Sequence, residues 1–198
     1  MRRHWQYLKY VLRHKWYVFL AGLKIGVPIF ILIFHDWDKF MPDEWFPYAR
    51  TFYKPNGEKQ YKPDGTGFDV AWLKHQNRNK HHWQYWMITW DKGNTECLPM
   101  PDVYRREMLA DWLGAGKAIT GKDNLEDWYW ANRDNIKVHP ETRLWLESQM
   151  DLSNYMDYAE YAGDIGDYVR AALQTGKPLP TVLGEVASVY RPEVLRNK

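Results

Sequence analysis

The segment VPIFILIFHDWDKF, residues 27–40, decides how this chain can fold, because an apolar run ends there on a cluster of charged residues. His35, Asp36, Asp38 and Lys39 lie at or just after the end of the run. Charged groups at the edge of an apolar core are costly unless they are paired or bind an ion. The segment therefore predicts a buried helix that delivers a histidine and carboxylates to a half-buried polar site.

Residues 17–34 are long enough to be tested as a membrane span, which needs about 18–20 apolar residues. Gly22, Lys24, Gly26 and Pro28 interrupt them, and the chain has no second apolar run. The mean hydropathy of the whole chain is −0.66. We therefore expect a buried core helix, no cleaved signal sequence and no association with a membrane.

The composition excludes several classes of protein. The chain has 198 residues, enough for one sizeable domain, and its formal net charge of +2 gives no reason to expect a nucleic-acid partner. Cys97 is the one cysteine in the sequence. A single cysteine excludes a disulfide framework and a cysteine-based zinc cluster, and it is typical of a reducing compartment. We expect a cytoplasmic protein.

Apolar residues at helical spacing, together with prolines at helix starts, predict an all-α fold. The 12 Trp, 14 Tyr and 7 Phe residues are expected mainly to fill its core. Loops are expected at residues 53–67 and 96–102. The expected helices are residues 4–20, residues 29–34, a helix from Pro42 with Pro47 in its first turn, residues 68–90, a helix from Pro101 that ends at Gly114 or Gly116, and a short helix near Pro140.

The character of the sequence changes after about residue 152, where it becomes acidic and rich in tyrosine. We expect residues 1–152 to form one helical domain and residues 153–198 to form a helical C-terminal extension. Such an extension is the natural candidate for contacts with a second copy of the chain, so a homo-oligomer is possible through it.

Histidines and carboxylates occur in an order that suggests a metal site. Helical spacing places His75, Asn79 and His82 on one face of the expected helix 68–90, with His81 pointing away. Together with His35-Asp36 and Asp111, they supply imidazole and carboxylate groups from several helices. This mixture suits Mn, Fe, Co, Ni or Zn and is too rich in nitrogen for calcium. Each residue also has an ordinary explanation as a core or surface side chain.

The order of these residues resembles that of the HD superfamily of metal-dependent phosphohydrolases. In those helical proteins a first histidine, a His-Asp dipeptide and a distal aspartate bind a divalent metal, and two-metal branches add two histidines before the last aspartate. The HDWDK stretch, residues 35–39, is similar to the HDxGK of the cyclic-dinucleotide phosphodiesterase branch and of di-iron oxygenases on the same scaffold. Asp38 stands where both have glycine. The resemblance implies a compact HD-like helical bundle with a metal site between helices.

A longer resemblance covers the chain to about residue 147. The chain is similar there to an uncharacterised family of bacterial and phage proteins, a domain of unknown function, which implies no established activity. The resemblance is carried by YLKYVLRHKWYVFLAGLKIG, HDWDKFMPDEWFPYARTF, FDVAWLKHQNRNKHHWQYW, MPDVYRREMLADWLGAG and HPETR.

The HD resemblance implies ligands for one or two divalent ions. For the first ion it implies His14, His35, Asp36 and Asp111, with His4 in reserve for His14. For a second ion it implies that Asp36 bridges and that His75 and His82 complete the site, with His81 as the alternative to His82.

The same resemblance implies hydrolysis of a small phosphate ester, a nucleotide or nucleotide-like molecule, through a metal-activated water. Lys39 is expected to face a phosphate or position that water, and Glu107 to carry a proton or support a ligand. The expected substrate-binding residues are Lys74, Arg78, Lys80 and Arg105 for phosphate oxygens and Trp83 for stacking. Two alternatives stay open: an HD-type di-iron oxygenase, and a non-enzymatic interaction protein stabilised by a metal.

Overall fold

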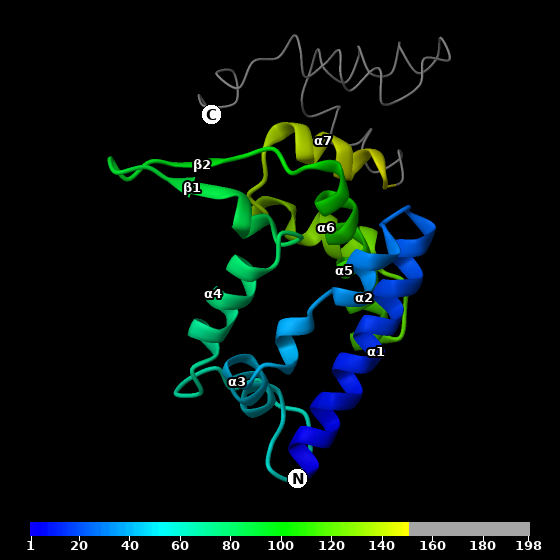
Figure 1. Cartoon of the computed structure of the whole chain (residues 1–198), viewed down its shortest axis with the longest axis vertical. Helices are drawn as coiled ribbons and strands as arrows, with labels where there is room; N and C mark the ends of the chain where they lie inside the picture. Colours follow the sequence, from blue (N-terminus) through cyan, green and yellow to red (C-terminus); the bar gives the residue numbers. More distant parts are fainter. Residues whose placement is uncertain (151–198) are drawn as a thin grey trace. The chain divides into compact units, whose positions relative to one another are not determined.

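The computed structural model describes residues 1–150, and over this range the chain is mostly helical, as predicted (Figure 1). The predicted extension 153–198 lies outside the described residues. The described residues divide into two compact units, one of residues 1–87 and 100–137 and one of residues 88–99 and 138–150. The first unit contains the α-helices α1 (Arg2–Lys24), α2 (Ile29–Phe34), α3 (Pro42–Phe52), α4 (Phe68–Arg78), α5 (Asp102–Thr120) and α6 (Leu125–Asn132) and the short 3-10 helices η1 (Trp37–Phe40), η2 (Trp83–Trp86) and η3 (Arg133–Asn135).

Helices α1 and α5 form the most extensive helix pair of the first unit. Gly114 lies against α1 so closely that a Cβ atom there would come within 2.4 Å of Val18 Cγ2 and 2.6 Å of the Val18 backbone nitrogen. The prediction that α5 ends at Gly114 or Gly116 was therefore wrong, because Gly114 serves close helix packing. The helix ends instead at Thr120, followed by Gly121 with a φ angle of 77°.

A bend at residues 25–28 separates α1 from α2. Gly26 takes a φ angle of 76°, and the Val27 amide donates to the Gly22 carbonyl at 2.9 Å. The apolar stretch 17–34 is thus divided between two helices, as the glycines and Pro28 predict. Within residues 1–150, the structure contains no helix with the length and apolar character required to cross a membrane.

Helix α3 packs on the N-terminal half of α1, and α4 packs on α3, around an aromatic core. Tyr7 and Val11 of α1 meet Tyr48 and Ala49 of α3 in this core. Pro47 lies in the middle of α3, so the prediction that it must fall within the first turn was wrong. Tertiary packing of the aromatic face evidently outweighs the backbone hydrogen bond that proline removes.

Helix α4 ends at Arg78, so the prediction of one helix over residues 68–90 was also wrong. The backbone of Asn79 is extended, and its side-chain amide donates to the His75 carbonyl at 2.9 Å and to Asp38 Oδ2 at 2.5 Å. Asparagine side chains compete with helical backbone hydrogen bonding in this way. The chain therefore turns at Asn79, and the following histidines leave the helix axis.

The described part of the second unit holds a short hairpin and one helix. Strands β1 (Met87–Thr89, which begins at the last residue of the first unit) and β2 (Thr95–Cys97) pair in a two-stranded sheet, where a loop and a helix end were expected. Helix α7 (Pro140–Ser148) begins with Pro140, as predicted, and the His139 ring accepts a hydrogen bond from the Glu141 amide at 3.2 Å. Apart from this hairpin and an isolated bridge between Tyr53 and Lys59, the regular structure of residues 1–150 is helical, as predicted.

Candidate metal centre

Asp36 lies at the centre of a buried polar cluster in the first unit. It joins the end of α2 to η1, and its side chain is fully buried. Its φ angle of 54° and ψ angle of 30° place it in the left-handed region, and no other non-glycine residue within residues 1–150 has a positive φ. Aspartate and asparagine tolerate this conformation better than most residues. The turn aims the carboxylate inward between the helices.

Four residues form what we term the first ligand set: His14, His35, Asp36 and Asp111. They come from α1, from the end of α2 and from α5. His14 Nε2 lies 3.1 Å from Asp36 Oδ2 and 3.1 Å from Asp111 Oδ1. His35 Nε2 lies 3.5 Å and 3.4 Å from the same two oxygens. All four residues implied for a first ion are therefore brought together.

A second ligand set consists of Asp36, His75, His81 and His82. His75 Nε2 and His81 Nε2 each lie 3.4 Å from Asp36 Oδ1. The prediction that His81 points away was wrong, because α4 ends before it. His82 is also buried here, so the structure places both histidines in the set. The two oxygens of Asp36 thus face different sets, Oδ2 the first and Oδ1 the second.

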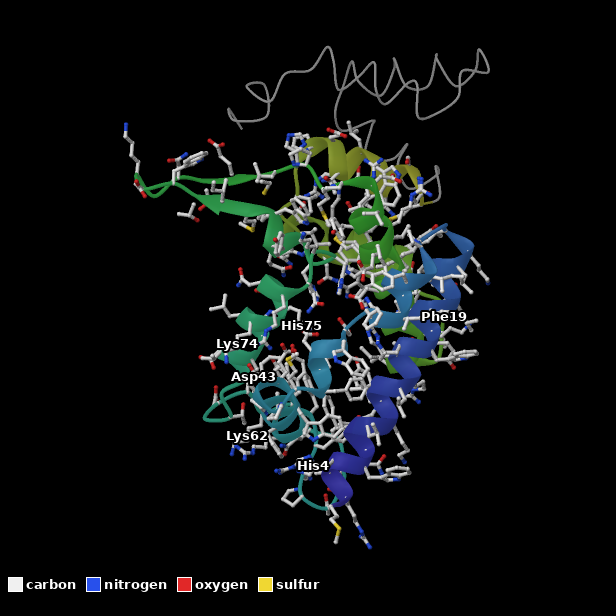
Figure 2. All side chains as sticks on the ribbon, viewed as in Figure 1. His4, Phe19, Asp43, Lys62, Lys74 and His75 are labelled. Atoms are coloured by element: carbon white, nitrogen blue, oxygen red, sulfur yellow. The ribbon has the colours of Figure 1, made fainter. Side chains whose placement is uncertain are left out.

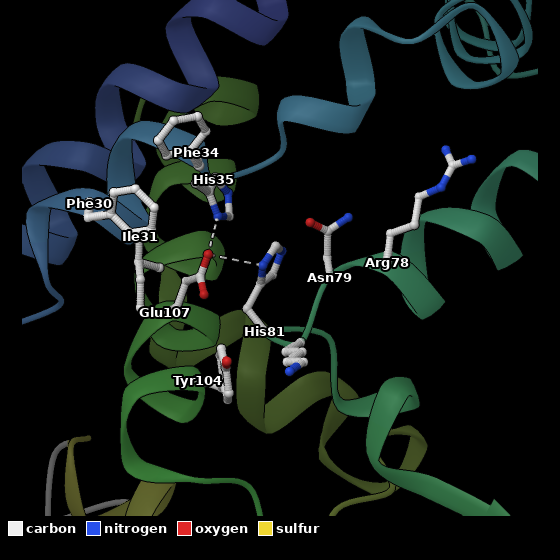
Figure 3. Close-up of a pocket in the computed structure, with 10 residues that line it drawn as sticks. Phe30, Ile31, Phe34, His35, Arg78, Asn79, His81, Tyr104 and Glu107 are labelled. Atoms are coloured by element: carbon white, nitrogen blue, oxygen red, sulfur yellow. Dashed lines mark hydrogen bonds and ion pairs between the residues drawn. The ribbon is translucent and has the colours of Figure 1, made fainter.

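Buried carboxylates hold the other ring nitrogen of three of these histidines. Glu107 Oε1 lies 3.0 Å from His35 Nδ1 and 3.2 Å from His81 Nδ1 (Figure 3). His75 Nδ1 lies 3.0 Å from both Asp38 Oδ2 and Glu44 Oε2. A carboxylate at Nδ1 keeps the proton there and leaves the Nε2 lone pair toward the centre, the arrangement typical of metal-ligating histidines.

The separations between donor atoms fit a transition-metal site. Metal–ligand bonds of about 2.0–2.2 Å put neighbouring ligand atoms roughly 3.0 Å apart in an octahedron and roughly 3.4 Å apart in a tetrahedron. The four histidine–carboxylate separations of the first ligand set are 3.1–3.5 Å, and the ligand atoms of each set all lie within 4.8 Å of one another. The donors are a mixture of imidazole and carboxylate, which suits Mn, Fe, Co, Ni or Zn.

Buried polar atoms without a hydrogen-bond partner also favour a metal site. Five candidate metal-ligand atoms of the two sets are buried without a hydrogen-bond partner in the described residues: Asp36 Oδ1 and the Nε2 atoms of His35, His75, His81 and His82. Each unpaired buried polar atom costs on the order of 1–3 kcal/mol. Their convergence on Asp36 is what a bound cation would resolve, so the residues fit one or two divalent ions.

A cavity of about 220 Å³ opens beside the cluster. His35, His81 and Glu107 line its polar side, and Phe30 and Phe34 of α2 lie on an apolar side (Figure 3). Lys80, Asn79, Arg78 and Tyr104 are also among its lining residues. The cavity therefore adjoins two of the candidate ligands, His35 and His81.

Comparison with known protein families matches residues 3–152 to a family of unknown function, DUF5662. The chain belongs to this family. The match covers every candidate ligand and confirms the longer of the two resemblances seen in the sequence. No curated protein and no solved structure matches the chain. The resemblance to the HD superfamily accordingly stays a prediction that rests on the residues themselves.

The protonation state of each residue in the cluster depends strongly on the charges of its neighbours. Burial alone would raise the pKa of Asp36, but the neighbouring cations of His35 and Lys39 hold that pKa well below its usual range. Burial alone would lower the pKa of His81, but the neighbouring carboxylates of Asp36 and Glu107 raise it to about 10. When its histidines are neutral, the cluster has more buried carboxylates than buried cations. Protons on the histidines or bound metal ions can supply the compensating charge.

Lys39 is not among the residues that line the cavity, and its expected contact with a phosphate or a metal-bound water stays a prediction. Its side chain is buried, and its Nζ lies 2.5 Å from Asp36 Oδ2. Burial opposes the charged ammonium, but the charge of Asp36 raises the pKa of Lys39 well above its ordinary value. Lys39 therefore compensates the charge of Asp36 and fixes its position, because Lys39 in η1 lies three residues, or one 3-10 turn, after Asp36.

Several predicted substrate-binding residues form ion pairs with carboxylates. Lys74 Nζ lies 3.0 Å from Asp43 Oδ2 on the outer side of α3 and α4 (Figure 2). Arg78 binds Asp43 at 2.8 Å and Glu44 at 2.7 Å, although it lines the cavity. Arg105 binds Asp102 at 2.8 Å.

Two further residues from the sequence analysis lie outside the cavity lining or the ligand sets. The structure does not place Trp83 among the residues that line the cavity. His4, the reserve ligand, accepts a hydrogen bond from the Trp45 indole at 2.9 Å, outside both ligand sets.

The roles of Asp38 and Glu44 were not anticipated from the sequence. Both orient His75. In the sequence, Glu44 follows Pro42 and is typical of the acidic first turn of a helix. Asp38 stands out only as a departure from the HDxGK pattern. That departure is the one available signal, because a carboxylate in place of glycine needs a partner when it is buried.

Proposed function

We propose that the chain is a metal-dependent phosphohydrolase that holds two divalent ions and acts on a small phosphate ester. The single observation that carries the proposal is the placement of Asp36, which presents one carboxylate oxygen to each ligand set. A shared carboxylate between two nitrogen-rich sets is the arrangement of two-metal hydrolytic sites. The order of ligands along the chain and the helical fold support an HD-like bundle.

Divalent ions at these positions would lower the pKa of a water molecule and neutralise negative charge on a phosphoryl group. The protein's own residues prepare the site. Glu107 holds His35 and His81 in the required ring orientation, and Asp38 and Glu44 do so for His75. Glu107 is thus a positioning residue in this scheme. Lys39 keeps Asp36 ionised and in place.

The cavity supports a small substrate. It lies beside His35 and His81 and is about 220 Å³ in volume, below the roughly 300–1,000 Å³ of pockets for drug-sized ligands. The formal net charge of +2 gives no support for a nucleic-acid partner. A compact phosphate ester satisfies both observations.

The test combines metal content with activity. Protein without a histidine tag is analysed for metals, then loaded separately with Mn, Fe, Co, Ni or Zn and assayed for phosphate release from a panel of phosphomonoesters, with Asp36→Asn as the control. We expect close to two ions per chain in the parent, fewer than one in the control, and turnover only in the parent. Iron-dependent oxygen consumption without phosphate release would replace the proposal with the di-iron oxygenase. A parent that binds no metal would overturn both.

A further inference from the structure

The cavity beside the ligand sets has an apolar wall made by α2. Phe30 and Phe34 lie on successive turns with ring centres 4.9 Å apart, and Ile31 lies next to Phe30 in the same lining (Figure 3). The side chain of Phe30 is 71% exposed and that of Phe34 is 52% exposed. Aromatic rings this exposed beside a polar centre offer a surface on which a flat apolar group can stack.

The cavity also contains a cation that is not neutralised by a carboxylate. Arg78, the other cation in the lining, is bound by Asp43 and Glu44. Lys80 has no carboxylate at ion-pair distance among residues 1–150, and its Nζ lies 5.5 Å from the centre of the Tyr104 ring. A lysine ammonium presented in this way is suited to bind a phosphate group.

These two features define a ligand class, on the basis of the proposed function. We propose that the cavity binds a compact phosphomonoester whose organic group is a flat aromatic ring. Lys80 binds the phosphate, and the ring lies against Phe30 and Phe34. The cavity volume of about 220 Å³ limits the ligand to a phosphate and a small ring system. Of the five cationic and stacking residues expected from the sequence, Lys80 is the one that the structure leaves available in the cavity.

The experiment measures binding separately from turnover. Phenyl phosphate and methyl phosphate are titrated calorimetrically into manganese-loaded protein, and phosphate release from both is assayed in parallel. One aromatic contact changes affinity by a factor of about two to ten. We expect phenyl phosphate to bind the parent at least about tenfold more tightly than methyl phosphate, with two rings contributing.

Separate variants test the apolar wall and Lys80. Phe30→Ala should lower the affinity for phenyl phosphate several-fold and leave methyl phosphate unchanged. Ile33→Ala is the matched control, since Ile33 is 54% exposed on the same helix but does not line the cavity. Lys80→Ala should weaken both ligands about tenfold, with substantial recovery in Lys80→Arg. Lys9→Ala is the control for this pair, because Lys9 lies 6.0 Å from the Trp5 ring, outside the cavity.

The outcomes distinguish the two proposals. Hydrolysis of both esters without a preference for the aromatic one, or a Phe30→Ala variant that matches Ile33→Ala, would overturn the ligand class and leave the phosphohydrolase standing. Tight, Lys80-dependent binding of phenyl phosphate without any phosphate release would support the ligand class and count against hydrolysis. Absence of binding by either ester to the metal-loaded parent would overturn the ligand class directly.

Discussion

The two ligand sets meet at Asp36 but are built on different kinds of backbone. In the first set, His14 and Asp111 project from the interiors of α1 and α5, the most extensively packed helix pair. In the second set, His81 and His82 lie in the irregular segment that follows α4. The first set is therefore positioned by helix packing, whereas the second depends on side-chain contacts such as those of Glu107 and Asn79.

The largest expected effect removes the residue that the sets share. Asp36→Asn keeps the left-handed turn accessible but removes the charge from both sets, so we expect metal content to fall from about two ions per chain to almost none. It also leaves Lys39 buried without its partner, which costs on the order of 3–5 kcal/mol of folding stability.

A second variant separates these two losses. Asp36→Asn combined with Lys39→Met should regain thermal stability without regaining metal, as measured by circular dichroism and elemental analysis. Retention of one ion by Asp36→Asn would show that one set binds its ion without the Asp36 carboxylate, and would contradict the proposal that both sets share this carboxylate.

Removing one ligand from one set should affect that set alone. We expect His14→Ala to lose the ion of the first set and His82→Ala to lose the ion of the second, each leaving about one ion per chain. Elemental analysis of both variants beside the parent provides the measurement. If either variant lost both ions, the two sets would bind cooperatively and could not be treated as separate sites.

A smaller effect should come from the helix contact beneath the first set. Gly114→Ala places a methyl group against the backbone of Val18, one turn from both His14 and Asp111. The helices must move apart, which we expect to cost about 1–3 kcal/mol of stability. Metal affinity should fall in the first set and stay unchanged in the second, as competition with a chelator would show. Gly116→Ala, at a glycine that faces the side-chain oxygen of Asn124, is the matched control.

A further expected effect, on stability and not on metal content, is a dependence of stability on pH in the absence of metal. The pKa of His81 is raised from 6.5 to about 10, so the folded state binds this proton more tightly than the unfolded state. The contribution to stability is complete below pH 6.5 and is lost as the pH rises to about 10.

The melting temperature of chelator-treated protein should therefore fall over that range. It should fall less in His81→Gln, and less again in metal-loaded protein, where the imidazole is already neutral. Identical curves for chelator-treated and metal-loaded protein would contradict this account.

The difference between the sets also explains what could be predicted from the sequence. His14, His35 and Asp111 lie on or next to regular helices, and their order was sufficient to group them. The position of His81 could not be predicted, because it depends on the Asn79 side chain ending α4 through contacts with His75 and Asp38. Asp38 is distant from Asn79 in sequence, and helical spacing contains no information about such a contact.

A similar limit applied to Gly114 and to the cations. A glycine that ends a helix and a glycine that admits a neighbouring helix look alike in a single sequence. Lys74, Arg78 and Arg105 were reasonable phosphate-binding candidates until their carboxylate partners were located. Which cation stays unpaired is decided by tertiary packing, so Lys80 could not be distinguished from them beforehand.

The left-handed backbone at Asp36 restricts which amino acids this position can accept. Its torsion angles admit glycine, asparagine and aspartate readily, and penalise longer or branched side chains. The proposed chemistry requires a carboxylate with one oxygen for each set, which only aspartate and glutamate possess. Aspartate alone satisfies both requirements. A saturation library at position 36, scored once for folding and once for metal, would therefore return two different lists of tolerated residues that overlap at a single member.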